Sequence, residues 1–173
     1  MASAVAEPAD SGTEPMEFAA GKTWSYYGGR EFPGAKGSVK WGSVDDLDVL
    51  AIQYDFSGGG AYVAARSPVD FAGEVSEFSF DVKASCKQKL VVRLVDSTKQ
   101  THQWPILYDR PDRWVSIKTS TKEPAPKHYA GADDGIVHYP IIEVMLCVAK
   151  SELGSALEPG EVAFSKLRFM KKQ

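Results

Sequence analysis

Cysteine is scarce in this sequence: Cys86 and Cys147 are the only two among 173 residues. Two cysteines are too few for a disulfide-dense scaffold, and their spacing does not match a zinc ribbon. One bridge between them is the alternative to two unpaired thiols. Because Cys147 lies in an alternating apolar segment, the pattern favours unpaired thiols, at least one of them buried.

Excess positive charge and long apolar runs are also missing. The net charge is -3, whereas a nucleic-acid-binding domain usually has a basic balance or a basic face. No apolar run approaches the length of about 20 residues that a membrane-spanning helix needs. The composition, with 43% hydrophobic and 25% charged residues, is that of a globular domain. We therefore expect neither nucleic acid nor a membrane as a partner.

The common catalytic motifs are absent as well. There is no G-x-S-x-G nucleophile elbow and no H-E-x-x-H metal motif, and three histidines offer few candidate bases. Gly58–Gly60 indicates a turn between strands rather than a phosphate-binding loop, because no Lys-Ser/Thr pair and no helix follow it. A pair of carboxylates for glycoside hydrolysis stays open among 23 acidic residues, but the sequence favours a binding protein.

The sequence does show a hydrophobic pattern that repeats every two residues. Apolar residues alternate with other residues in segments 50–56, 78–82, 90–94 and 142–148, a pattern typical of half-buried antiparallel strands. Further strands are expected at residues 16–20, 38–42, 61–67, 101–106, 114–119 and 162–169. About ten strands predict an all-β fold, a two-sheet antiparallel β-sandwich of the jelly-roll type. We assign residues 16–173 to this single domain and residues 1–15 to a linker or an added N-terminal segment.

The outward positions of these strands suggest a sugar-binding surface. Tyr and Trp rings stack on the C–H face of a sugar, and Arg, Gln, Asp and Glu form hydrogen bonds with its hydroxyl groups. The strand candidates are Gln53, Asp55, Tyr62, Arg66, Arg93, Glu143 and Met145. Either Gln103 or the pair His102 and Trp104 joins them, depending on register. Trp104 and Tyr108, on either side of Pro105, are expected to be exposed. The alternative is an outer sheet surface that is merely solvated.

One segment raises the question of a metal. Asp133 and Asp134 precede Gly135, and adjacent carboxylates before a glycine are able to contribute oxygen ligands to calcium. Glu17, on the expected first strand, is a separate candidate ligand. A solvated turn is the alternative.

Four stretches of the sequence resemble the galactose-binding-domain-like jelly rolls found as carbohydrate-binding modules beside bacterial glycoside hydrolases. They are WSYYGGREFPGAKG at 24–37, YDFSGGGAYV at 54–63, LVDSTKQTH at 94–102 with Trp114, and HYAGADDG at 128–135. The resemblance covers residues 16–170. It implies glycan binding without catalysis, often with a structural calcium near the first and last strands. In many such modules an acidic residue of the final strand reaches that calcium, whereas Ser165 and Lys166 stand there in this chain.

These observations together predict a module that captures a plant cell-wall polysaccharide of the β-glucan or xylan type. A neutral polysaccharide is expected because the predicted surface has few charges. The resemblance implies a secreted or cell-surface protein with an attached catalytic domain, and no cofactor beyond a structural calcium. Two alternatives remain: a sandwich domain that packs on a glycosidase without binding sugar, and a small polysaccharide lyase or hydrolase.

Overall fold

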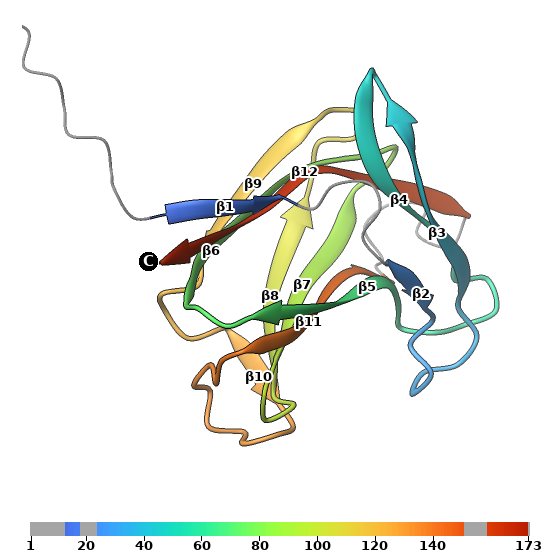
Figure 1. Ribbon diagram of the computed structural model, residues 1–173. Coiled ribbons are helices and arrows are strands. Elements are labelled where there is room, and N and C mark those ends of the chain that lie inside the picture. Colours follow the sequence, from blue (N-terminus) through green and yellow to red (C-terminus); the bar gives the residue numbers. More distant parts are fainter. Residues whose placement is uncertain (1–12, 18–23, 151–158, 173) are drawn as a thin grey trace, which may run out of the picture.

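The computed structural model describes residues 13–17, 24–150 and 159–172 (Figure 1). Twelve strands and no helix occur in these ranges, and the strands form two antiparallel sheets stacked face to face. Within the same ranges, no helix has the length and apolar character that a membrane span requires. The predicted two-sheet β-sandwich is therefore confirmed.

The first sheet has the strand order β3-β4-β12-β6-β9, and β1 also pairs with β12. Its strands are β1 (Thr13–Glu17), β3 (Lys36–Val44), β4 (Leu47–Asp55), β6 (Val75–Ala84), β9 (Val115–Ser120) and β12 (Gly160–Lys172). Strand β1 begins before Met16, the predicted start of the domain. The rest of the predicted linker, residues 1–12, lies outside the described residues.

The second sheet has the order β10-β8-β7-β11-β5-β2. Its strands are β2 (Ser25–Tyr27), β5 (Tyr62–Phe71), β7 (Gln88–Asp96), β8 (Thr101–Tyr108), β10 (Lys127–Tyr129) and β11 (Ile141–Ala149). The sequence did not predict β2 and β10, because three residues each are too few to show a period of two.

The core lies between the two sheets and is built from the inward residues of both. The Phe78 ring of β6 meets the Trp104 ring of β8 edge to face, with ring centroids 5.7 Å apart. Ile52 of β4 and Leu146 of β11 are likewise buried in this core. The alternation predicted for these strands is thus what places their apolar members inside.

Three predicted site residues on strand β8 are buried instead of exposed. His102, Trp104 and Tyr108 all face the core, with 0%, 5% and 0% of their surface exposed, so the predicted exposure of the two rings is wrong. The reason is that Pro105 does not interrupt the strand. Strand β10 pairs only with residues 101–103 of β8. At Pro105, β8 is therefore an edge strand on the side of β10, and an edge strand needs no N–H donor on its unpaired side.

A bulge in β11 changes another prediction. The register shifts between Ile141 and Glu143, so Ile141 enters the core and Ile142 is only half-buried. A β-bulge adds one residue to one strand and reverses the alternation on one side of it. Cys147 of β11 is buried, Cys86 is partly exposed, and neither is in a disulfide; the preference for unpaired thiols is confirmed.

Candidate functional site

The outer face of the second sheet brings together residues from all six of its strands. The registers align one row that crosses the whole sheet. From β2 to β10 this row is Ser25, Arg66, Met145, Arg93, Gln103 and Lys127. Four of its members were predicted as site residues, because outward positions of a strand can be identified by their spacing.

A hollow of about 420 Å³ lies on this face. Its floor consists of small side chains, namely Ala61, Val91, Cys147 and Ala149. The larger side chains of Glu31, Phe32, Tyr62, Arg93 and Tyr129 form its walls. Burial raises the pKa of the Cys147 thiol to about 12, so this cysteine is a neutral part of the floor rather than a nucleophile.

Glu31, in the loop between β2 and β3, joins two tyrosines of the sheet. Its carboxylate accepts a hydrogen bond of 2.9 Å from the hydroxyl of Tyr27 and a short one from the hydroxyl of Tyr62. Partial burial raises the pKa of Glu31, but the bonds from these hydroxyls outweigh it and leave the pKa below its ordinary value. Burial and the bond to Glu31 raise the pKa of Tyr62. Glu31 is therefore an ionised acceptor beside two neutral phenols.

Two arginines of the central row lie over the same two tyrosines. The Cζ atom of Arg93 is 4.3 Å from the centroid of the Tyr62 ring, and that of Arg66 is 5.2 Å from the Tyr27 ring. Such cation–π contacts are attractive and hold the guanidinium plane against the ring. Arg93 also donates from Nε to Oε1 of Gln103 at 2.9 Å. Both arginines are thus fixed on the sheet surface.

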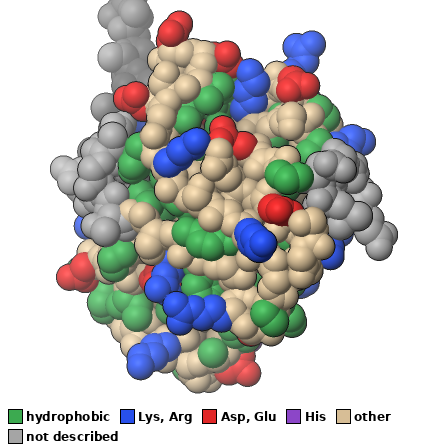
Figure 2. All heavy atoms as spheres, turned by 90° about the vertical axis from the view of Figure 1, so that its right-hand side faces the viewer, with side chains coloured by type: hydrophobic (Ala, Val, Ile, Leu, Met, Phe, Trp, Pro, Cys, Tyr) green, Lys and Arg blue, Asp and Glu red, His purple; other side chains and the backbone are tan. Residues whose placement is uncertain are grey.

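Exposed aromatic side chains stand at the edge of the hollow. Phe32 is 53% exposed and Tyr129 is 43% exposed. Figure 2, which views the right-hand side of Figure 1, where β2 and β3 lie, shows hydrophobic side chains next to Lys and Arg side chains in the lower part of the view. Sequence reasoning did not select Glu31, Phe32 or Tyr129 for the site. They lie in loops or in a three-residue strand, where no period gives the direction of a side chain.

The predicted site residues are divided between the two sheets. Tyr62, Arg66, Arg93, Gln103, Glu143 and Met145 lie on the outer face of the second sheet. Gln53 and Asp55 lie on β4 of the first sheet. There Gln53 bonds with Ser38 and Glu161, and Asp55 accepts a bond of 2.8 Å from the backbone N–H of Ser57. The structure therefore does not bring Gln53 and Asp55 to the hollow.

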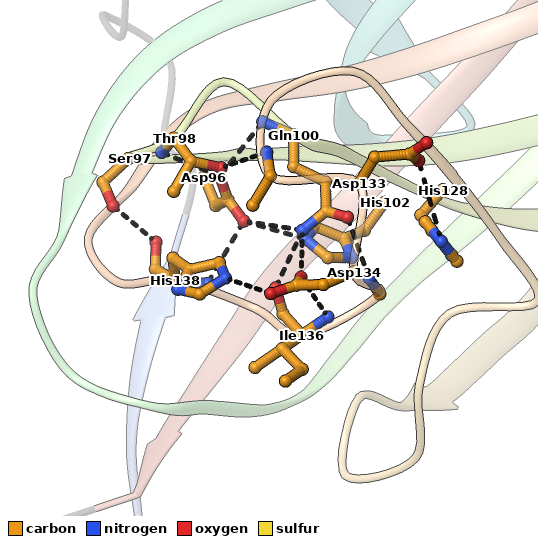
Figure 3. A network of polar contacts seen from close by, with 12 residues as sticks. Asp96, Ser97, Thr98, Gln100, His102, His128, Asp133, Asp134, Ile136 and His138 are labelled. Atoms are coloured by element: carbon orange, nitrogen blue, oxygen red, sulfur yellow. Dashed lines mark hydrogen bonds and ion pairs between the residues drawn. The ribbon is translucent and has the colours of Figure 1, made fainter.

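His102 belongs to a buried polar network instead (Figure 3). Its Nε2 atom is 3.0 Å from Oδ2 of Asp96, a fully buried carboxylate. Asp96 also accepts bonds from the backbone N–H groups of Thr98, Gln100 and His138. Because His138 comes from the loop that precedes β11, this network attaches the loop to the turn between β7 and β8. His102 is a structural residue, not a surface contact for ligand.

Of the predicted calcium ligands Asp133 and Asp134, the second accepts hydrogen bonds through its carboxylate. Oδ1 of Asp134 accepts bonds from Gln100 Nε2 at 3.1 Å and from the N–H of Ile136 at 2.9 Å, and Oδ2 is 3.0 Å from His138 Nε2 (Figure 3). Asp133 is 3.8 Å from the His128 ring. Glu17 is on β1, paired with Arg168 in the first sheet; its side chain lies outside what the structure describes. The oxygens of Asp134 are occupied by donors and therefore do not fit a calcium ion.

Known proteins resemble this chain in structure but not in sequence. No family profile matches the chain, and no curated protein matches it in sequence. The chain is similar in structure to a family 11 carbohydrate-binding module from Clostridium thermocellum in complex with a β-1,3-1,4-mixed-linked tetrasaccharide. The identity is 13%, the match covers 95% of this chain and 98% of that chain, and the TM-score is 0.64.

Two further solved structures are similar. The family 11 module of the cellulosomal cellulase Lic26A-Cel5E of Clostridium thermocellum matches at 13% identity and a TM-score of 0.64, over 94% of this chain and 96% of that chain. An agarase matches at 13% identity and a TM-score of 0.56, over 94% of this chain but 25% of the agarase. This chain has the jelly-roll β-sandwich fold of carbohydrate-binding modules of glycoside hydrolases.

Proposed function

We propose that the protein is a non-catalytic module that binds a polysaccharide chain on the outer face of its second sheet. The observation that carries this proposal is the hollow of about 420 Å³ with the exposed rings of Phe32 and Tyr129 beside Arg93 and Glu31 in its walls. An aromatic ring offers an apolar surface for the C–H face of a sugar. The guanidinium donates and the carboxylate accepts hydrogen bonds, so the walls supply both partners that a sugar hydroxyl needs.

The plant cell-wall polysaccharides of the β-glucan and xylan type are the first ligands to test. The family 11 module in complex with a mixed-linked tetrasaccharide supports this choice, since it has the same fold. We further propose that the module is secreted or cell-surface and attached to a polysaccharide-degrading catalytic domain. The agarase of which the match covers 25% supports this arrangement. Binding of the module would raise the local concentration of substrate at such an enzyme.

The exposed ring of Tyr129 is expected to contribute directly to affinity. Tyr129→Ala should weaken polysaccharide binding about fivefold to tenfold, because stacking and apolar contact at one ring are worth about 1–1.4 kcal/mol. Its exposure of 43% means that the melting temperature should hardly change. The measurement is affinity electrophoresis in native gels that contain mixed-linkage β-glucan, xylan or agarose, followed by calorimetry with the best ligand.

The matched control is Gln53→Ala, which removes a polar side chain from the outer face of the first sheet. It should leave retardation in the gels unchanged. Loss of retardation in Gln53→Ala but not in Tyr129→Ala would move the site to the first sheet. No retardation of the unaltered protein in any gel would favour the alternative of a sandwich domain that packs on a catalytic domain.

We also propose that the fold requires no calcium at Asp133 and Asp134. Support comes from the donors around Asp134, and among the described residues no group of three His, Cys, Asp or Glu side chains is placed to hold a metal ion. EDTA is therefore expected to leave the thermal unfolding midpoint unchanged. A clear fall in the midpoint that added calcium reverses, and magnesium does not, would contradict the proposal.

A further inference from the structure

The central row of the second sheet has positive charges and no acidic residue. Arg66, Arg93 and Lys127 all lie in this row. Adjacent strands are about 4.8 Å apart, and each of these cations is two strands from the next, so they recur at roughly 10 Å intervals across the sheet. A polymer that crosses the strands along this row meets a cation at regular intervals.

Neither arginine of the row, Arg66 or Arg93, forms an ion pair with a carboxylate of the described residues. Glu31 is the acidic side chain in the walls of the hollow, and it is bound to the hydroxyls of Tyr27 and Tyr62. The arginines contact rings and an amide, which leave their positive charge in place. The charge of Arg93 also helps to lower the pKa of the ionised Glu31, whereas Arg66 does not line the hollow with this carboxylate.

Their stacking also fixes them before a ligand arrives. A guanidinium held over a ring loses little freedom on binding, and a planar guanidinium matches the paired oxygens of a carboxylate or a sulfate ester. The row is not part of a generally basic surface, because the chain as a whole has a net charge of -3. A row of fixed cations on an acidic protein indicates a local preference for anions.

On these grounds we propose that the site takes an anionic polysaccharide, one whose sugars carry carboxylate or sulfate groups that bind Arg66 and Arg93. This inference rests on the proposed function and replaces the neutral sugar expected from the sequence. The sequence shows few charges on the predicted surface, and only the registers reveal that the positive ones share one row.

The test compares charged polysaccharides with their own neutral forms. Binding is measured for glucuronoxylan and its carboxyl-reduced form, for a sulfated galactan and its desulfated form, and for mixed-linkage β-glucan. We expect about tenfold or tighter binding of one charged polymer over its neutral form, as charge-assisted hydrogen bonds predict. A difference between glucuronoxylan and its reduced form would identify carboxylate as the bound group, and a difference between the sulfated galactan and its desulfated form would identify sulfate. The difference should shrink as sodium chloride is added.

Variants connect the preference to the residues. The readout is the ratio of the affinities for the charged form and its neutral form, and Arg66→Gln combined with Arg93→Gln should reduce this ratio to about one. Arg93→Lys should keep only part of the preference, because lysine lacks the planar fork. Lys40→Gln, an exposed cation on β3 of the first sheet, is the control and should keep it in full. Thermal melts of each variant confirm that it is folded.

The outcomes separate the two proposals. Equal binding of the charged and neutral forms would overturn the anionic preference and leave polysaccharide binding standing. A preference that survives in a folded double variant would also overturn it. Absence of binding to all five polymers would overturn the proposed function and this inference with it.

Discussion

Asp96→Asn is expected to lower the free energy of unfolding by about 3 kcal/mol, as removal of a buried, multiply bonded charge does. Asp96 is fully buried and its two carboxylate oxygens face donors only. Oδ1 accepts bonds from the Thr98 hydroxyl at 2.7 Å and from the backbone N–H of Gln100 at 3.1 Å. Oδ2 is 3.1 Å from the N–H of His138 and 3.0 Å from His102 Nε2.

Asparagine has the same shape but only one acceptor oxygen. Its amide N–H₂ would point at donors, whichever way it turns, and at least one buried N–H group would lose its partner. The measurement is urea unfolding at neutral pH. Asp109→Asn is the control, because Asp109 is exposed, and it should not change the unfolding curve. A loss below about 1 kcal/mol in Asp96→Asn, the value of one ordinary hydrogen bond, would show that the network is unimportant for stability.

The same network predicts how stability depends on pH. Burial raises the pKa of Asp96, but the bonds from His102, Thr98 and the backbone outweigh it and hold the pKa well below its ordinary value. Hydrogen bonds from Ile136, Gln100 and His138 lower the pKa of Asp134 to about 2. In the unfolded chain both carboxyls take up a proton near pH 3.8, their ordinary value. Their stabilising contribution is therefore full above that pH and is lost as the pH falls through the lower native values.

Asp96→Asn should accordingly flatten the acid limb of the stability curve. Unfolding by urea at a series of pH values between about 2 and 6 measures the slope in both proteins. An unaltered slope in the variant would mean that other carboxyls cause the loss of stability in acid.

Gly34→Ala is the second substitution with a large expected effect, and it should weaken polysaccharide binding about tenfold or more by displacing the β2–β3 loop. Gly34 has a φ of 121°, which an alanine rarely adopts. A Cβ atom there would overlap the carbonyl oxygen of Gly58. Because that oxygen belongs to the backbone of the Gly58–Gly60 turn, the loop would have to move. Glu31 and Phe32 would then leave the walls of the hollow.

The strain should also reduce stability by about 1–3 kcal/mol, the usual cost of a residue in such a backbone region. Gly42→Ala is the matched control, since an added Cβ would meet no atom within 4 Å. Both variants are compared by calorimetry with the best polysaccharide and by urea unfolding. Full affinity in a destabilised Gly34→Ala would show that the β2–β3 loop does not contribute to the site.

The sequence predicted the sandwich because the signal for a half-buried strand is local. Alternation from Leu90 to Leu94 needs no knowledge of the neighbouring strand, and it correctly placed Arg93 outside. Which sheet a strand joins is not local, and for that reason Gln53 and Tyr62 were assigned to one surface although they lie on different sheets.

The errors at β8 and in the loops have the same origin. Pro105 suggests a turn when it is considered alone, but the strand that would need its N–H group ends before it. Phe32 and Glu31 lie in a loop whose course depends on contact between Gly34 and the Gly58–Gly60 turn. No spacing in the sequence records such a contact, so these two site residues become visible only in three dimensions.

The buried carboxylate network has a consequence for the kinetics of binding. Tyr129 is on β10, whose pairing with β8 includes His102, the partner of Asp96. Gly135, a few residues further on, donates from its backbone to the side chain of Gln100. The backbone that bears the rim tyrosine is therefore held in position by the fold itself. When no rearrangement precedes capture, related ligands associate at similar rates, and the lifetime of the complex distinguishes a good polysaccharide from a poor one.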